Sequence, residues 1–253
     1  LKVNSNNDER RSFDSSITQE AIKMIEGDDK IKMTKSTVLF KSDWHKGVLG
    51  IVASRCIDKF YRPTVILTKS NDKATGSARS IDGFDVYEAI SECSDLLDQY
   101  GGHMYAAGLT LDVDNVPAFI EKFEKIVKEK VTEEQLIPRI DIDQVIDIDM
   151  ITPKFLEIIN QMSPFGPFNS QPVFMSENLY VPSRPRILKK EHLKFYVHQE
   201  GNEKICEVIG FGLAQYFELI NSGMRFKMAY TIEENNYIEQ VSIQLQAKDI
   251  KFD

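Results

Sequence analysis

The pattern of apolar residues changes near residue 131, and this change constrains the fold more than any other feature of the sequence. Before it, short apolar runs such as 36–40 and 64–68 alternate with amphipathic segments such as 47–60 and 116–131. Short apolar runs are typical of buried strands, and apolar residues spaced three or four apart are typical of helices. The first part of the chain is therefore predicted to be an α/β domain.

The second part of the chain is dominated by strand-like runs with polar turns between them. These runs are 140–149, 173–181, 184–190, 193–199, 204–210, 225–233 and 237–249. Short helices are expected at 152–161 and 213–221, and Asn235-Asn236 is predicted to form a tight hairpin turn. Several short strands with a helix among them predict a small all-β barrel domain that follows the α/β domain.

The predicted boundaries place a connector helix and polar lead-in at 1–35, the α/β domain at 36–133 and the barrel domain at 134–253. A charged stretch follows the last amphipathic helix and supports a division there. Within the first segment, Ser16 is predicted to cap a helix, because Gln19 follows three residues later and completes a capping box.

Cysteine usage and hydropathy bound the cellular context. The three cysteines, Cys56, Cys93 and Cys206, form no C-x-x-C pair. An odd count without such pairs argues against a disulfide framework and a cysteine zinc site, so buried free thiols in a reducing compartment are expected. No apolar run approaches the roughly 20 residues that span a bilayer, and residues 1–14 are unlike a signal peptide. We therefore expect a cytoplasmic location and no membrane partner.

The charge distribution is uneven. The net charge is -8, which is unusual for a protein that binds nucleic acid. However, one short segment carries five cations against the single acid Glu191, and these cations are candidate strand-binding residues. They are Arg184, Arg186, Lys189, Lys190 and Lys194.

Two glycine-containing motifs are the strongest candidates for a phosphate site. In Gly101-Gly102-His103, paired glycines allow positive φ and close approach of a ligand, and the histidine can donate to a phosphate oxygen. The alternative is a glycine that only ends the preceding helix. The second motif is Gly76-Ser77-Ala78-Arg79-Ser80. Its guanidinium can hold a phosphate through two hydrogen bonds, with Ser77 and Ser80 as further donors, although a solvated arginine at a strand end would look the same.

A third candidate lies between a predicted strand and a predicted helix. Trp44, His45 and Lys46 precede the helix, and a helix N-terminus is a natural anion site. Trp44 could stack on a base or could be a core anchor, and the sequence does not separate these two interpretations.

Four acids alternate with isoleucines in 140–149. Asp141, Asp143, Asp147 and Asp149 could bind a hard cation. The alternation is more typical of a half-buried strand with its acids facing water, which we prefer. No metal site is therefore predicted in this chain.

The order of these motifs resembles the RecJ family of single-stranded-DNA-specific exonucleases. The residues that resemble its DHHA1 domain are Trp44-His45-Lys46-Gly47-Val48-Leu49-Gly50-Ile51-Val52-Ala53-Ser54-Arg55, Arg62-Pro63, Gly76-Ser77-Ala78-Arg79-Ser80, Gly101-Gly102-His103 and Ala106-Ala107-Gly108. Those that resemble its OB-fold domain are Pro164-Phe165-Gly166, Asn169, Pro172-Val173-Phe174, His192-Leu193-Lys194-Phe195 and Ile209-Gly210-Phe211-Gly212. The segment Phe168-Asn169-Ser170 departs from the more usual Gly-Asn-Pro of the family, which puts the local turn geometry in doubt.

The resemblance implies a division of labour. In the family, an Asp-His-His domain with manganese or magnesium precedes this region, so the chain would be a C-terminal fragment, inactive alone, of a 5′→3′ exonuclease of DNA repair and recombination. Arg79 and His103 would hold phosphates of single-stranded DNA, and the barrel would grip the strand further along. The alternatives are a phosphodiesterase of short or cyclic dinucleotides, or a non-catalytic module that recruits a single-strand-binding protein through Arg184 and Arg186.

Overall fold

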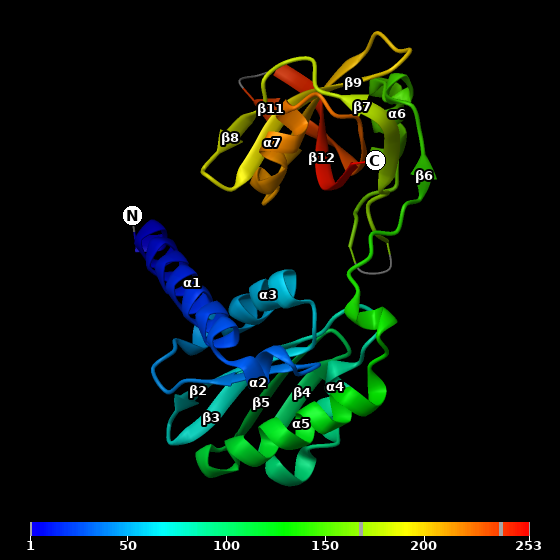
Figure 1. Cartoon of the computed structure of the whole chain (residues 1–253). Coiled ribbons are helices and arrows are strands. Elements are labelled where there is room, and N and C mark those ends of the chain that lie inside the picture. Colours follow the sequence, from blue (N-terminus) through cyan, green and yellow to red (C-terminus); the bar gives the residue numbers. More distant parts are fainter. Residues whose placement is uncertain (1, 167–168, 238–239, 253) are drawn as a thin grey trace. The chain divides into compact units, whose positions relative to one another are not determined.

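The computed structural model describes residues 2–166, 169–237 and 240–252, which fold into two compact units, 1–138 and 139–253 (Figure 1). We describe each unit by itself. Within the described ranges, no helix combines the length and the apolar character needed to cross a membrane.

Unit 1 is built on a five-stranded sheet with the order β1-β2-β3-β5-β4. The strands are β1 (Thr37–Phe40), β2 (Thr64–Ser70), β3 (Lys73–Arg79), β4 (Gln99–His103) and β5 (Ala106–Asp112). Only β1 and β2 run parallel, because the helix between them returns the chain to the same end of the sheet; the other pairs are antiparallel. The predicted strands and their α/β context are thus confirmed.

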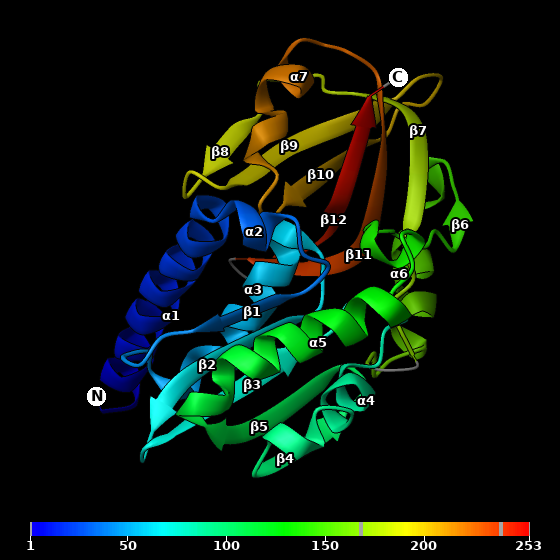
Figure 2. The same cartoon turned by 60° about the horizontal axis from the view of Figure 1, so that its bottom comes forward.

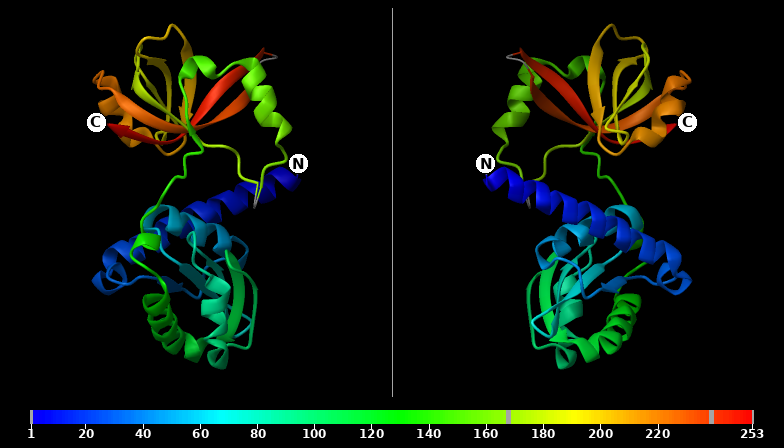
Figure 3. Two further views of the ribbon diagram at one scale, coloured as in Figure 1. Left: turned by 90° about the vertical axis from the view of Figure 1, so that its right-hand side faces the viewer. Right: turned by 90° about the vertical axis from the view of Figure 1, so that its left-hand side faces the viewer.

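Helices cover the two faces of this sheet unequally. The helices are α1 (Lys2–Gly27), α2 (Asp29–Lys32), α3 (Leu49–Phe60), α4 (Val86–Ser91) and α5 (Val116–Lys130). One face packs against α4 and α5 over β1, β2, β3 and β5, through residues such as Leu67 and Phe119 (Figure 2). The other face packs against α1 and α3 at Leu39 and Ile66 (Figure 3). Beyond Ile66, on β3, β5 and β4, this second face carries mostly polar side chains and glycine.

The first helix begins earlier than predicted. Ser16 lies inside α1, and its hydroxyl donates to the carbonyl of Phe13 at 3.2 Å. The capping box at Ser16 is therefore wrong. The polar residues before Ser16 lack apolar periodicity, so their pattern does not predict a helix. Charged and polar residues are nevertheless compatible with helical structure. Ile17 and Ala21 then anchor α1 in the core with α3.

Unit 2 is a closed barrel. Its sheet has the order β6-β7-β11-β12-β10-β9-β8, and a further pairing of β7 with β9 closes the ring. The strands are β6 (Gln144–Val145), β7 (Phe174–Tyr180), β8 (Arg186–Leu188), β9 (His192–Gln199), β10 (Ile205–Gly210), β11 (Phe226–Tyr237) and β12 (Gln240–Phe252), with helices α6 (Pro153–Gln161) and α7 (Phe217–Asn221). Closure removes most exposed strand edges, and it confirms the predicted barrel.

Two local predictions in this unit are wrong. The run 140–149 is not one continuous strand, because it contains only the short β6 and the start of a 3-10 turn at Ile148–Met150. Its four acids are exposed as expected, and Asp143 and Asp147 also accept hydrogen bonds from Val173 and Gln199. Asn235 lies within β11 and pairs with Ser242, so it does not form the hairpin turn. The motif that starts at Pro164 includes residues 167 and 168, which lie outside the described residues.

Helix α4 ends at Ser91 and is followed by a 3-10 turn, Ser94–Leu96. The three cysteines are free and buried, as predicted. Burial raises the pKa of both the Cys56 and Cys93 thiols to about 11. Thiols of this kind are structural side chains rather than nucleophiles.

The barrel core contains one buried polar chain. The Tyr230 hydroxyl lies 2.7 Å from the Ser176 Oγ, and Ser176 donates to the carbonyl of Ile146 at 2.6 Å. Tyr230 is fully buried, and burial raises the pKa of its phenol well above the usual range. This chain ties β11 to β7 and to the entry of the barrel.

We expect Tyr230→Phe to lower the free energy of unfolding of unit 2 by about 1–2 kcal/mol, because the buried Ser176 oxygen loses its donor. Denaturant unfolding followed by circular dichroism measures this change. Tyr180→Phe is the matched control within unit 2, since the Tyr180 side chain is only half-buried, and its effect should stay within about 0.5 kcal/mol. Equal effects of both substitutions would contradict the assignment.

Candidate functional site

The open part of the unit 1 sheet carries three cross-strand rows that share one face. Residues directly opposite one another in paired strands point to the same side of a sheet. The rows are Thr75, Thr110 and Gln99; Ser77, Gly108 and Gly101; and Arg79, Ala106 and His103. The middle row continues into Ile66 and Leu39, which α3 covers, so the open surface begins where that helix ends.

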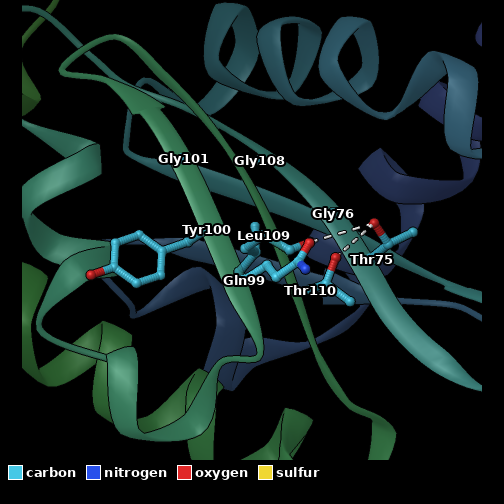
Figure 4. Close-up of a pocket in the computed structure, with 8 residues that line it drawn as sticks. All are labelled: Thr75, Gly76, Gln99, Tyr100, Gly101, Gly108, Leu109 and Thr110. Atoms are coloured by element: carbon cyan, nitrogen blue, oxygen red, sulfur yellow. Dashed lines mark hydrogen bonds between the residues drawn. The ribbon is translucent and has the colours of Figure 1, made fainter.

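The middle row has almost no side chains, which creates a hollow in the sheet surface. Gly108 and Gly101 pair directly, and each is exposed. The hollow has a volume of about 340 Å³ and is bordered by Thr75, Gln99 and Thr110 (Figure 4). A ligand can therefore approach the backbone of β5 and β4 closely, as the glycines suggested.

The two glycines of Gly101-Gly102-His103 have different roles. The motif is part of strand β4 and not the positive-φ loop expected from the sequence. A Cβ on Gly101 would meet no described atom within 4 Å, whereas a Cβ on Gly102 would come 2.2 Å from the Ala106 carbonyl oxygen. Gly102 also has φ of +154°. Strand pairing therefore requires glycine at position 102. It does not require glycine at position 101, where the absence of a side chain keeps the face of the sheet open.

Arg79 lies in the row next to Ser77, Gly108 and Gly101, and its electrostatic environment is unusual. Its Nη1 donates to Ser77 Oγ at 2.9 Å and to the carbonyl of Ala78 at 2.8 Å. No carboxylate pairs with it among the described residues, and burial lowers the pKa of its guanidinium. A half-buried cation of this kind is stabilised when an anion binds beside it.

The first turn of α3 packs against the Arg79 guanidinium at Gly50. A Cβ on Gly50 would come 2.4 Å from Arg79 Nη2, so a larger residue there would displace the guanidinium from this position. The N-terminal end of a helix also favours a negative ligand through its backbone dipole. The helix therefore adds to the anion preference of Arg79.

Of the other residues predicted for this site, His103 fits and Ser80 does not. His103 is exposed in the same row as Arg79, and its Nδ1 accepts from the Tyr105 backbone N–H at 3.3 Å, which leaves Nε2 for a ligand. Ser80 donates its hydroxyl proton to the carbonyl of Phe84 at 2.6 Å. Its predicted role as a phosphate donor is corrected accordingly.

The Trp44 segment is mainly structural. Trp44 is 4% exposed and donates its indole N–H to Glu20 at 2.7 Å, so it cannot stack on a base. The His45 Nδ1 accepts from the Gly47 N–H, which removes one of the donors expected for an anion. His45 stacks on Phe13 with ring centroids 5.3 Å apart. Lys46 is exposed and is the one member of the trio whose head group faces solvent freely.

In unit 2, four of the five predicted cations are available. Arg184, Arg186, Lys189 and Lys190 are exposed and form no ion pair with any part of the chain that the structure describes. Lys194 differs, since its Nζ lies 3.0 Å from a Glu207 carboxylate oxygen. Its predicted role as a possible strand-binding residue stays a prediction, with its charge paired to Glu207.

A metal site is not formed by the residues that the structure describes. No group of three or more His, Cys, Asp or Glu side chains lies close enough to hold a metal ion in those ranges. Asp143 and Asp147 are engaged in hydrogen bonds within the barrel. The donor set thus does not fit a catalytic divalent cation.

Several site residues could not be found from the sequence. Thr75, Thr110 and Gln99 border the hollow only because three strands pair in one register. Gly50 resembled an ordinary helix residue. The alternation of polar and small residues in β3 was the one available signal, and it does not say which face stays open.

The chain combines an α/β domain that has an open, glycine-containing sheet face with a closed β-barrel domain. Comparison with known families finds the same two kinds of domain in the same order. Residues 31–129 match the DHHA1 domain and residues 142–249 match the RecJ OB domain. The chain is 36% identical over 248 residues to the single-stranded-DNA-specific exonuclease RecJ of Bacillus subtilis, covering 96% of this chain and 31% of that protein. It therefore belongs to the RecJ family, of which it contains the DHHA1 and OB region.

A second relative is similar in sequence, and a solved structure shows the same fold. RecJ of Haemophilus influenzae is 28% identical over 252 residues, which are 97% of this chain and 44% of that protein. The crystal structure of Thermus thermophilus RecJ with Mg²⁺ has the same fold, with a TM-score of 0.72 at 22% identity over 99% of this chain and 37% of that one. The chain thus spans less than half the length of these relatives.

The contrast between the two glycines gives a structural prediction. Gly102→Val should lower the free energy of unfolding of unit 1 by at least about 2 kcal/mol, because the new side chain meets backbone in a disfavoured conformation. Gly101→Val should change it by less than about 0.5 kcal/mol. Thermal and denaturant unfolding measure both. If Gly101→Val were as destabilising as Gly102→Val, the open position assigned to Gly101 would be wrong.

Proposed function

We propose that this chain is the strand-binding part of a RecJ-type 5′→3′ exonuclease, and that the open face of unit 1 holds the phosphodiester backbone of single-stranded DNA. The observation that carries the proposal is the half-buried Arg79 guanidinium, which has no carboxylate partner in the described ranges and borders a row without side chains. The names of the relatives, which are exonucleases specific for single-stranded DNA, support the choice of ligand.

The geometry suggests how the strand is held. Arg79 offers Nη2 and the outer edge of its guanidinium to phosphate oxygens, which a planar fork binds through two hydrogen bonds. Ser77 has its oxygen engaged by Arg79, so its own hydroxyl proton is available to the same anion. His103 stands two strands away in the same row and can donate to a neighbouring phosphate. The glycines between them allow the sugar–phosphate chain to lie on the sheet.

The barrel extends the binding surface. Arg184, Arg186, Lys189 and Lys190 would contact phosphates further along the strand, so that local positive charge overcomes a net charge of -8. The two arginines would also accept the acidic tail of a single-strand-binding protein. Charge reversal at both positions, measured with such a tail peptide, tests that second partner.

Cleavage itself is not assigned to the described residues. Solved structures of Thermus thermophilus RecJ hold Mg²⁺ or Mn²⁺, and metal ions can activate water for phosphodiester hydrolysis. The described part of this chain has no matching cluster of ligands. We therefore propose that this chain binds and orients the strand, and that metal-dependent hydrolysis needs residues that it does not supply.

Removal of the key cation should weaken strand binding. We expect Arg79→Ala to raise the Kd for a 15-nucleotide thymidylate strand about 10- to 100-fold, since charged hydrogen bonds are each worth about 1.5–3 kcal/mol. Gly101→Val should weaken it as well, by filling the floor. Fluorescence anisotropy over a range of salt concentrations measures both changes.

The matched control is Lys125→Ala, because Lys125 is an exposed cation on α5, which covers the opposite face of the sheet. It should change the Kd less than twofold. The proposal is wrong if the unaltered chain shows no salt-sensitive binding of the strand. Binding of a dinucleotide as tightly as the 15-nucleotide strand would instead favour a small-molecule phosphodiesterase.

A further inference from the structure

Phe211 is an exposed aromatic residue in a barrel whose other described aromatics are buried or half-buried. It is 55% exposed and lies just beyond the end of β10, whereas Phe195 and Phe226 are almost completely buried. An exposed phenylalanine ring leaves a large apolar surface in water, which is unfavourable unless a ligand covers it.

The surroundings of Phe211 hold it in place. Its ring lies edge to face with the His192 ring, with centroids 5.2 Å apart. The backbone N–H of Gly212 donates to His192 Nδ1 at 3.2 Å, which joins the end of β10 to the start of β9. Gly212 itself has φ of +72°, a conformation that glycine adopts without strain. Phe211 is therefore a fixed feature of this surface.

A second apolar side chain shares the face. Along β9 the residues alternate between core and surface, with Leu193 and Phe195 inside, so His192 faces outward. Leu188 of β8 pairs directly with His192 and is 38% exposed. Because paired residues share a face, Leu188, His192 and Phe211 belong to one outward-facing surface, which we call the Phe211 platform.

Free positive charge borders the Phe211 platform. Arg186 lies two residues from Leu188 on the same strand and the same face. Lys189 and Lys190 form the tip of the β8–β9 hairpin, with φ of +50° and +66°. Asparagine and glycine are the residues that such turns prefer, and two lysines there are a less stable choice. The two lysines therefore make the turn less stable than asparagine and glycine would, and they place positive charge next to the Phe211 platform.

The middle of the barrel's outer surface is less suitable for an anionic strand. The Glu207 carboxylate there accepts hydrogen bonds from Lys194, Tyr196 and Gln244. The Lys194 and Gln244 hydrogen bonds hold the pKa of Glu207 below its usual value despite the opposing effect of burial. Because Glu207 is paired with Lys194, this part of the surface offers no free cation to a phosphate among the described residues, whereas unpaired cations lie at the end of the sheet near Phe211.

We propose that the Phe211 platform stacks a base of single-stranded nucleic acid while Arg186, Lys189 and Lys190 hold the adjoining phosphates. Stacked aromatics beside cations are how proteins bind single strands without reading their sequence. The inference rests on the proposed strand-binding function and adds to it a base-contacting residue outside unit 1.

The test compares two ligands that differ only in their bases. One is a 15-nucleotide thymidylate strand, and the other is a 15-unit strand of abasic tetrahydrofuran nucleotides with the same phosphates. We expect Phe211→Ala to weaken binding of thymidylate roughly 5- to 150-fold, the range that loss of one stacked base produces, and to leave the abasic strand unaffected. Phe211→Tyr should keep the affinity for both, which excludes a folding defect as the cause.

Ile205→Ala is the matched control, because Ile205 is also an exposed apolar residue of β10, 53% exposed, but at the other end of the strand. The affinity of the Ile205→Ala chain for the thymidylate strand should be unchanged. An equal loss for both ligands in Phe211→Ala, or no loss for thymidylate, would overturn the stacking role while leaving the strand-binding proposal intact. Failure of the unaltered chain to bind either strand would overturn both proposals. A Phe211→Ala chain that binds thymidylate normally but loses an aspartate-rich peptide would show that the platform serves a protein partner instead.

Discussion

The register of three antiparallel strands is the constraint on which the rest of the candidate site depends. Pairing of Ser77 with Gly108 and of Gly108 with Gly101 creates a row without bulky side chains. The next row then holds Arg79 and His103. Because side chains alternate between the faces of a strand, a slip of one residue would turn Arg79 into the core and Ala78 out of it. Gly102 protects this register, since no larger residue fits between β4 and the Ala106 backbone.

Unequal coverage of the sheet turns this register into a surface. The α4–α5 layer buries one face over β1, β2, β3 and β5, whereas α1 and α3 bury the other face only over β1 and β2. Trp44 anchors this second layer through Glu20. In an acidic chain many lysines are neutralised by nearby carboxylates, including Lys73, Lys130 and Lys194. Cations without such partners, above all Arg79 and those of the β8–β9 hairpin, therefore mark where an external anion can bind.

The sequence was informative where the physical signal is local. Apolar periodicity predicted α3, α5 and most strands, and the barrel followed from the run of short strands. The two motifs around Arg79 and Gly101 also indicated the candidate site, and their role in binding stays a prediction. Their geometry could not be predicted, because glycine is equally compatible with a positive-φ loop and with an edge strand. The roles of Thr75 and Gln99 depend on pairing between distant strands, and the exposure of Phe211 depends on where β10 ends, so neither had a local signal.

We propose above that a single strand of DNA lies on the open face of the unit 1 sheet. Backbone amide chemical shifts of the isotope-labelled chain, recorded during titration with a short thymidylate strand, test this most directly. If the strand lies on this face, the largest chemical-shift changes in unit 1 should fall on 75–79, 99–103 and 106–110, and they should disappear in Arg79→Ala. Shifts confined to α4 and α5, or a response in unit 1 that does not change when Arg79 is removed, would contradict it.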